Sequence, residues 1–266
     1  MSQRDIPLRD LLNVATDAAY LAGRRTLAYF NSEVLVESKA DATPVTIADR
    51  EAEQVIRARI ARFYPDHSVL GEEHGDTRRA NPEYRWYIDP IDGTKSFIHG
   101  VPMYGVLVAV EVRGRPSVGV CYLPATDEMV AAADGLGCTW NGRVARVSSV
   151  AKIEDATMNT SSITAALGRS DAYENLIRRV KLNRGWGDAY GYVLVATGRA
   201  EVMLDPVINP WDVAPLPPIL REAGGRFTNW AGAETIHGPD GVATNGALHE
   251  QVLSVLKSER RRDPAR

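Results

Sequence analysis

The segment WYIDPIDGTKSF, residues 86–97, carries the residues best suited to do chemistry. An apolar run ends at Asp89, and the proline that follows cannot donate to a strand ladder, so Asp89 and Asp92 project just beyond a predicted strand. Gly93 and Thr94 can open a short helix whose backbone N–H groups would face a phosphate. Carboxylate and hydroxyl oxygens are ligands that Mg²⁺ prefers. The structural alternative is a turn that ends the strand, where Asp-Gly pairs are common.

Acidic residues elsewhere in the chain add to this group. Glu72 and Glu73 follow a predicted strand, where two adjacent carboxylates call for a cation or a helix N-terminus nearby. Asp49 lies in the first turn of a predicted helix, where it can complement the helix dipole or form a capping box with Thr46. Asp212 also lies in a first helical turn and has the same structural explanation. Together these sites predict an acidic centre assembled from distant segments.

Predicted helices and strands must bring these segments together. Hydrophobic periodicity predicts helices over 10–30, 46–63, 170–180, 190–197, 211–223 and 247–257, and strands over 34–36, 68–71, 86–89, 105–112, 117–122, 157–160, 202–204 and 226–229. Strands cluster first and later alternate with helices, which predicts an α+β half joined to an α/β half. We assign residues 1–150 to a first domain with most metal ligands, 151–258 to a second domain with Asp212 and the specificity residues, and 259–266 to a disordered tail. Pro215, Pro217 and Pro218 predict a kinked or delayed helix over 211–223.

Composition excludes several classes of protein. The chain has 266 residues, of which 44% are hydrophobic and 24% charged, an ordinary globular balance. A net charge of −3 gives no general attraction for nucleic acid, and an anionic substrate would need a local device such as metal ions. We find no signal peptide and no apolar run of membrane-spanning length, so we expect a cytoplasmic protein with no membrane partner. Cys121 and Cys138 lack CxxC spacing and are predicted to be buried free thiols.

The order and separation of three blocks carry a family resemblance. Gly71–Glu72–Glu73 after a strand, WxxDPxDGT over 86–94, and Trp211–Asp212 follow one another as in the inositol monophosphatase superfamily of Mg²⁺-dependent, lithium-sensitive phosphatases. The chain resembles that superfamily from its first helix to about Lys257. The resemblance implies a mixed α+β and α/β fold, layered as an α-β-α-β-α sandwich, and a homodimer.

The resemblance also implies a role for each acidic site. Glu72, Asp89, the Ile91 carbonyl and Thr94 would surround a first metal ion, Asp89, Asp92 and Asp212 a second, and Glu72 would also reach a third, weaker one. The ions would be Mg²⁺, two or three in number, with Mn²⁺ as an alternative. Asp49 and Thr94 would orient and deprotonate the attacking water, with Glu72 in the catalytic group. Asp92, Gly93, Thr94 and Lys95 would contact the substrate, although Lys95 can also be a charge at the rim.

The substrate's organic half is expected to meet Asp188 and Asp205. Asp188 stands where typical inositol monophosphatases have a small uncharged residue, and Asp205 where the family has an acidic residue that contacts the substrate alcohol. A buried carboxylate without a counter-charge is costly, so two carboxylates suit a cationic substrate such as histidinol phosphate. The runs GDAYGY, NPWD and DGTKSF also resemble the histidinol-phosphate phosphatase branch. A salt bridge from Asp188 to Arg184 is the structural alternative.

Histidinol phosphate is therefore the expected substrate of a Mg²⁺-dependent phosphomonoesterase of histidine biosynthesis. Inositol phosphate and other small phosphates, including phosphonucleotides, stay open as alternatives. A catalytically silent binding protein on the same fold is a further alternative of a different class, and it would release no phosphate when Mg²⁺ is supplied.

Overall fold

The computed structural model describes residues 5–39 and 43–258. The helices are α1 Leu8–Leu27, α2 Ile47–Phe63, α3 Thr94–Ile98, α4 Ile163–Arg169, α5 Asp171–Ile177, α6 Asp188–Ala196, α7 Pro210–Val213, α8 Leu216–Ala223 and α9 His249–Ser258, with a 3₁₀ turn at Ile153–Asp155. The strands are β1 Val36–Ser38, β2 Pro44–Thr46, β3 His67–Gly71, β4 Gly75–Thr77, β5 Asn81–Asp92, β6 Gly105–Val112, β7 Arg115–Leu123, β8 Glu128–Ala133, β9 Gly137–Trp140, β10 Arg143–Val144, β11 Thr157–Thr160, β12 Leu182–Arg184, β13 Val202–Asp205, β14 Arg226–Thr228 and β15 Gly241–Thr244.

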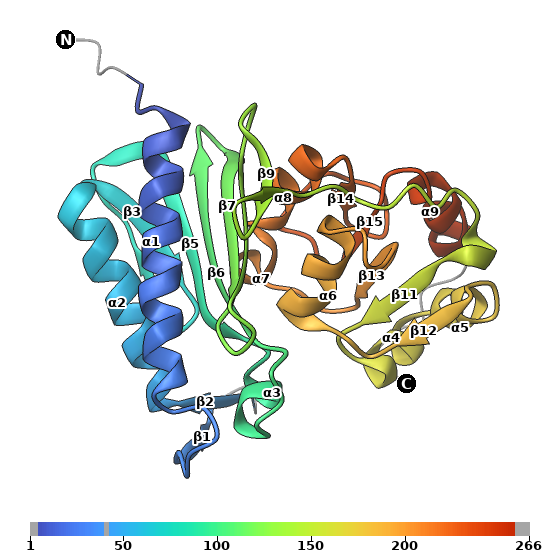
Figure 1. The fold of residues 1–266 in the computed structure, drawn as a ribbon, viewed down its shortest axis with the longest axis horizontal. Coiled ribbons are helices and arrows are strands. Elements are labelled where there is room, and N and C mark those ends of the chain that lie inside the picture. The colour runs from blue at the N-terminus through green and yellow to red at the C-terminus, as the bar shows by residue number, and fades with distance from the viewer. Residues whose placement is uncertain (1–4, 40–42, 259–266) are drawn as a thin grey trace.

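Two large sheets and three helical layers alternate through the molecule (Figure 1), and β1 and β2 form a separate two-stranded sheet. The larger sheet has the strand order β10-β9-β8-β7-β6-β5-β3-β4, and the smaller one has β12-β11-β13-β15-β14. Helices α1 and α2 cover the outer face of the larger sheet, α6, α7 and α8 lie between the sheets, and α4, α5 and α9 lie beyond the smaller one. The predicted α-β-α-β-α sandwich is thereby confirmed.

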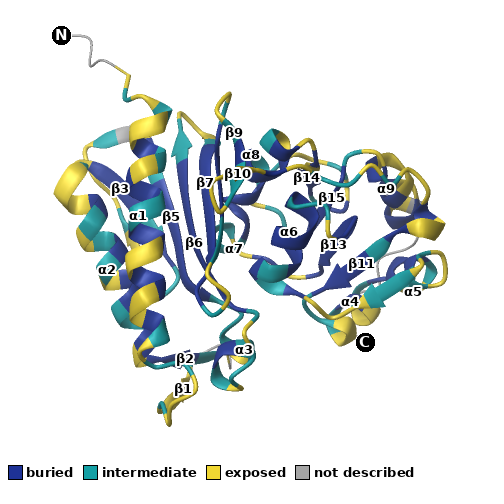
Figure 2. Ribbon diagram, viewed as in Figure 1, coloured by how far each residue is buried: buried dark blue, intermediate teal, exposed yellow. Residues whose placement is uncertain are grey.

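The side chains of β6 point alternately to the two faces of the larger sheet, and those on both faces are apolar. Val106, Val108 and Val110 pack toward α1 and α2, whereas Leu107 and Ala109 pack toward the middle helices. Successive side chains of a strand point to opposite faces, so an unbroken apolar run is what a strand buried on both sides requires. Figure 2 shows this sheet as buried through its centre. The larger sheet is therefore a rigid platform for the segments at its ends.

A capping box starts α2 as the sequence predicts. The Thr46 hydroxyl accepts the N–H of Ala48 at 3.1 Å, and the Thr46 N–H donates to Asp49 Oδ2 at 2.8 Å. Such reciprocal bonds satisfy donors that the first helical turn leaves free. This cap fixes the position of Asp49 relative to the helix.

The helix predicted over 211–223 is broken in two. Helix α7 ends at Val213, and α8 begins at Leu216 after Pro215. A proline ring cannot donate the helical hydrogen bond and clashes with the preceding turn, which is the delay that the sequence predicts. The chain between α7 and α8 lies directly on β7, since a Cβ placed on Gly119 would be only 2.1 Å from the Pro215 carbonyl oxygen. Asp212 consequently sits on its own short, anchored helix.

Other predictions need smaller corrections. The strand predicted at 34–36 lies at Val36–Ser38, and the helix predicted over 170–180 ends at Ile177, before β12. Strands β2, β4, β8, β9, β10, β12 and β15 and helix α4 were not predicted, and β5 extends at both ends beyond the strand predicted at 86–89. Cys121 and Cys138 are buried free thiols, as expected. The division into domains at residue 150 stays a prediction, and the tail 259–266 lies outside the described residues.

Candidate active site

Five of the acidic residues singled out in the sequence, Glu72, Asp89, Asp92, Asp188 and Asp212, line one pocket at the end of β5. The pocket has a volume of about 190 Å³. Its lining residues are Thr43, Pro44, Glu72, Asp89, Ile91, Asp92, Gly93, Thr94, Lys95, Asp188, Asn209 and Asp212. Residues from the larger sheet thus meet Asp188 at the start of α6 and Asp212 on α7. Asp49 and Asp205 are not part of this lining.

Strand pairing brings Glu72 next to Asp89. Strand β3 runs parallel to β5 with Gly71 opposite Ile88, and the Glu72 N–H continues this ladder by donating to the Ile88 carbonyl at 3.2 Å. Parallel strands run toward the same sheet edge, so Glu72, directly after β3, and Asp89, near the end of β5, reach the same pocket. The Gly71–Glu72–Glu73 block and the DPxDGT block are therefore neighbours, as the sequence predicts.

An irregularity in β5 turns Asp92 into the pocket. The register with β6 shifts between Asp89 and Asp92. Asp89 Oδ1 accepts the Ile91 N–H at 3.0 Å, and the Thr94 hydroxyl donates to the Ile91 carbonyl at 3.1 Å. A bulge re-aims side chains in this way next to many active sites. Gly93 follows at a φ of 86°, a left-handed conformation that glycine adopts without strain.

Asp49 and Asp212 both cap their helices through a single carboxylate oxygen, and the charge of Glu72 acts on both carboxylates. The hydrogen bonds of the Asp49 cap use Oδ2, whereas Oδ1 is buried without a hydrogen-bond partner among the described residues. In the same way, Asp212 Oδ2 accepts the Asn209 N–H at 2.7 Å. The structural and the catalytic explanations for these two residues are thus compatible, because each carboxylate has two oxygens.

Burial and mutual repulsion make this group of carboxylates costly to ionise. Burial, followed by the charges of Glu72, Asp92 and Asp212, raises the pKa of Asp89 well above its usual value. Burial is also the main cause that raises the pKa of Asp212 to about 7 and that of Asp49 to about 6. Divalent cations would favour the ionised forms and relieve the repulsion. The electrostatics therefore fit a metal-binding role.

The donor set fits hard cations, although carboxylates alone do not complete a site. Within residues 5–39 and 43–258, no group of three or more His, Cys, Asp or Glu side chains is arranged to hold a metal ion by itself. The Ile91 carbonyl and the Thr94 hydroxyl line the same pocket and supply further oxygens. Asp92 Oδ2 is engaged by the Ala189 N–H. The assignment of ligands to particular ions accordingly stays a prediction.

Two residues that the sequence analysis missed hold the turn with Glu72 in place. Lys39 Nζ donates to Glu72 at 2.7 Å and to Glu73 at 2.5 Å. The fully buried Glu53 carboxylate accepts the Glu73 N–H at 2.7 Å and the His74 N–H at 3.2 Å. It also accepts Arg57 Nε at 2.7 Å. The one available signal for Glu53 in the sequence was that this charged residue is spaced at helical intervals from the apolar residues of α2.

Asp188 separates the acidic pocket from a neighbouring cavity of about 260 Å³. The second cavity also contacts Lys95, Ser161, Ser162 and Val207. Asp188 has a φ of 53°, which is uncommon outside glycine and is found in residues constrained by function. Burial, together with the charge of Asp205, raises the pKa of Asp188 to about 7. The two cavities suit the two ends of a phosphate ester.

Asp188 and Asp205 differ in how far neighbouring side chains engage them. The described ion pairs do not join Arg184 to Asp188, and Arg184 instead donates to the Asn183 carbonyl at 2.8 Å. Asp205 Oδ2 accepts the Tyr192 hydroxyl at 2.7 Å, and Oδ1 accepts the Ser161 hydroxyl. Asp205 is therefore held by its neighbours, which leaves Asp188 as the carboxylate more directly exposed to both cavities.

Comparisons with known proteins agree with this geometry. The histidinol-phosphatase of Chlorobaculum parvum is 42% identical over 249 residues, which cover 92% of this chain and 96% of that protein. The histidinol-phosphatase of Mycobacterium tuberculosis is 40% identical over 233 residues, covering 85% and 89%. The solved inositol monophosphatase of Anabaena superposes with a TM-score of 0.84 at 31% identity, covering 95% of this chain and 97% of that one. Residues 8–261 match the Inositol monophosphatase family, and the chain thus belongs to that family of metal-dependent phosphoric monoester hydrolases.

Proposed function

We propose that this phosphomonoesterase hydrolyses histidinol phosphate to histidinol and phosphate with the help of Mg²⁺. One observation carries the choice of substrate: the partly buried carboxylate of Asp188 lies on the wall shared by the acidic pocket and the neighbouring cavity. A cationic group in that cavity would favour the ionised form of Asp188, whose pKa is otherwise raised to about 7. Histidinol phosphate carries an ammonium group and an imidazole, whereas inositol phosphate has no cation at its organic end.

Bound Mg²⁺ would supply charge neutralisation of the phosphate and of the leaving alkoxide, and it would lower the pKa of a water molecule. We assign the donors to Glu72, Asp89, Asp92 and Asp212, with the Ile91 carbonyl and the Thr94 hydroxyl. These groups would hold the phosphate end in the acidic pocket, next to the ammonium of Lys95. Gly93 would allow close approach of the phosphate, because it carries no side chain.

The protein's own part in the reaction is to place a water molecule and accept its proton. Asp49 Oδ1 is the buried oxygen without a described hydrogen-bond partner, so it can accept a hydrogen bond from water. The Thr94 hydroxyl donates to the Ile91 carbonyl, which leaves its lone pairs for a second hydrogen bond from the same water. Asp49 and Thr94 would thereby fix the direction of attack on phosphorus. Glu72 would act with them through its place beside Asp89.

The leading alternative is hydrolysis of inositol phosphate or of another small phosphate ester. Among the relatives, the inositol-1-monophosphatase of Synechocystis is 32% identical over 256 residues. Because Asp188 would lack a counter-charge with such a substrate, we expect lower catalytic efficiency. The homodimer and the cytoplasmic location expected from the sequence stay predictions, and the described part of the chain has no helix long and apolar enough to cross a bilayer.

The test is the ratio of kcat/KM for histidinol phosphate to that for inositol 1-phosphate at saturating Mg²⁺. We expect the ratio to favour histidinol phosphate, and the Asp188→Asn variant to raise KM for this substrate by about tenfold, as the loss of one charge-assisted hydrogen bond implies. KM for inositol 1-phosphate should change much less. Asp155→Asn, on the surface turn before β11, is the matched control. Equal effects of Asp188→Asn on both substrates would refute the role of charge, and phosphate release from neither ester would favour a silent binding protein.

A further inference from the structure

A separate cavity of about 430 Å³ lies between the β6–β7 hairpin, helix α8 and strand β14. Its lining shares no residue with the acidic pocket or the cavity next to it. Charged residues from four different segments reach it, namely Arg115, Arg221, Arg226 and Glu234. Phe227 and Ile236, both almost fully buried, form part of its apolar wall together with Pro116 and Pro217. A volume of this size holds a small organic molecule.

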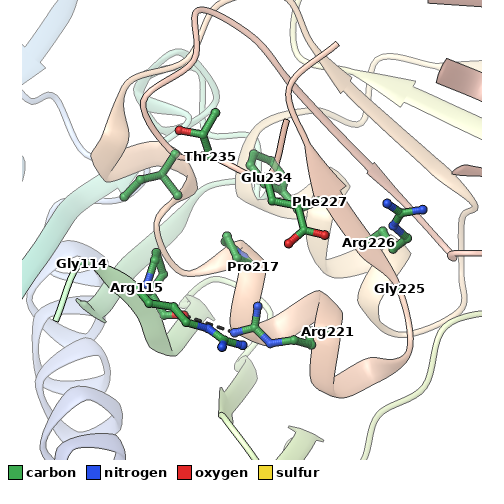
Figure 3. A pocket seen from close by; sticks show the side chains of 11 residues that line it. Gly114, Arg115, Pro217, Arg221, Gly225, Arg226, Phe227, Glu234 and Thr235 are labelled. Atoms are coloured by element: carbon green, nitrogen blue, oxygen red, sulfur yellow. Dashed lines mark hydrogen bonds between the residues drawn. The ribbon is translucent and has the colours of Figure 1, made fainter. Parts of the chain in front are cut away.

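One wall of this cavity has more positive than negative charge. Figure 3 shows the guanidinium groups of Arg115 and Arg221 next to each other. The carboxylate of Asp134 is their shared partner, at 3.5 Å from Arg115 and 2.5 Å from Arg221. Arg221 also donates to the Pro116 carbonyl at 3.2 Å. Two guanidinium groups and one carboxylate leave a net positive charge, which suits the carboxylate of a ligand.

Glu234 supplies the opposite charge across the cavity. Its side chain is exposed, and Figure 3 shows its carboxylate pointing toward the side where Arg115 and Arg221 lie. The hydrogen bonds and ion pairs of the described residues give Glu234 no partner, whereas Arg226 is paired with Glu250 at 2.7 Å. A simple anion would be repelled by Glu234, and a simple cation by the guanidinium pair. The cavity therefore favours a molecule that carries both charges.

We propose that this cavity binds the zwitterion of an α-amino acid with an apolar side chain. The α-carboxylate lies against Arg115 and Arg221, the α-ammonium group against Glu234, and the side chain against Phe227 and Ile236. The proposal is independent of the substrate assigned above, because it uses none of the catalytic residues. Helix α8, which carries Arg221, follows the short helix with Asp212, so the bound amino acid contacts the segment that continues from the acidic pocket.

Isothermal titration calorimetry with phenylalanine and leucine tests the proposal on the full chain. Mg²⁺ and inorganic phosphate are kept present, so that the acidic pocket is occupied by its own ligands. We expect binding of one molecule per chain, weakened about tenfold by N-acetylation, which removes the ammonium charge, and about tenfold by esterification of the carboxylate. Absence of binding by both amino acids would overturn the proposal.

Variants identify the cavity as the place of binding. Glu234→Gln should weaken the binding of phenylalanine about tenfold and should abolish the difference between phenylalanine and its N-acetyl derivative. Arg115→Met should instead reduce the difference between phenylalanine and its methyl ester, because only Arg221 then faces the carboxylate. Arg178→Met, at the C-terminal cap of α5, is the control and should leave binding unchanged. Phosphatase activity should be unchanged in all three variants, and undiminished binding in Glu234→Gln and Arg115→Met would place the amino acid elsewhere and refute the assignment.

Discussion

The substitution Glu53→Gln tests whether a buried charge below the active site holds the turn with Glu72. The Glu53 side chain is fully buried, and its two oxygens accept the N–H groups of Glu73 and His74 and the Nε–H of Arg57. A Cβ on Gly71 would lie 2.2 Å from Glu53 Oε1, so this carboxylate packs directly against the end of β3. Gln has nearly the same shape but presents an NH₂ group where one of the two acceptors was.

The expected loss of stability follows from these contacts. Removing one partner of a buried ion pair costs about 3–5 kcal/mol, and a hydrogen bond to a charged group contributes about 1.5–3 kcal/mol. Part of this is retained, because the Gln carbonyl still accepts one N–H group. Arg57 also keeps the Gly75 carbonyl at 2.6 Å and the Thr77 hydroxyl at 3.1 Å. We therefore expect the free energy of unfolding to fall by about 2–4 kcal/mol.

Two measurements separate stability from positioning. Urea unfolding gives the free energy of unfolding, and the Mg²⁺ concentration that gives half-maximal activity reports the affinity for the ion. Because the turn carries Glu72, we expect this concentration to rise about tenfold, whereas kcat at saturating Mg²⁺ should recover toward the wild-type value. Direct binding of Mn²⁺, followed by electron paramagnetic resonance, should weaken in parallel.

Glu51→Gln is the matched control, since it lies on the same helix and loses a more exposed ion pair with Arg25. Such a pair contributes about 0–1 kcal/mol, so the control should unfold almost as the wild type does. If Glu53→Gln changed the free energy of unfolding by less than about 0.5 kcal/mol, the contribution assigned to these buried hydrogen bonds would be wrong. Unchanged Mg²⁺ dependence in a destabilised variant would refute the positioning of Glu72.

Asp89→Asn should lower kcat by about a thousandfold on every phosphate ester while the fold persists in circular dichroism; comparable turnover would exclude Asp89 from the site. Burial lowers the pKa of His67 from 6.5 to about 4, so the stability contributed by its neutral imidazole is complete above the unfolded pKa and is lost as the pH falls through the folded value. Urea unfolding from pH 7 to pH 4 should thus show a weaker pH dependence in His67→Gln, and equal pH dependences would contradict this. Gly119→Ala should lower Tm and destabilise the chain by about 3 kcal/mol, because its Cβ would meet the Pro215 backbone. Gly168→Ala, with open space around its Cβ, should be neutral or stabilising, and equal Tm values would refute the close contact.

Local sequence signals predicted the helices and strands that have a strong hydrophobic periodicity or a clear residue signal where they begin or end. The apolar alternation of β6 and β7, the Thr46 cap and the proline break before α8 are written in neighbouring residues. Strands β8 and β9 lack such a signal: residues 130–133 read Val-Ala-Ala-Ala, and alanine has little strand preference. Strand β8 forms on the open edge of β7, and β9 forms in turn on the edge of β8, so both depend on the assembled sheet.

The acidic site was predictable in its members but not in their supports. Asp89, Asp92 and Glu72 are marked by short blocks that follow strands, and the structure brings them together. Lys39 and Glu53 act through contacts with Glu72, Glu73 and His74 that depend on tertiary packing. The engagement of Asp205 by Tyr192 and Ser161 is likewise a product of the folded arrangement. Residue type and spacing therefore predict which residues can do chemistry better than they predict which neighbours hold those residues in position.

The placement of Asp212 on a helix of the middle layer has a consequence for biosynthesis. A chain that emerges from the ribosome can assemble the larger sheet, with Glu72, Asp89 and Asp92, long before α7 has been translated. Such a nascent or truncated chain would expose the middle face of its sheet and lack one acidic member of the pocket. The chain would then hydrolyse its substrate only after the last third of the polypeptide has packed against the larger sheet. Enzymatic activity would therefore report that folding is complete.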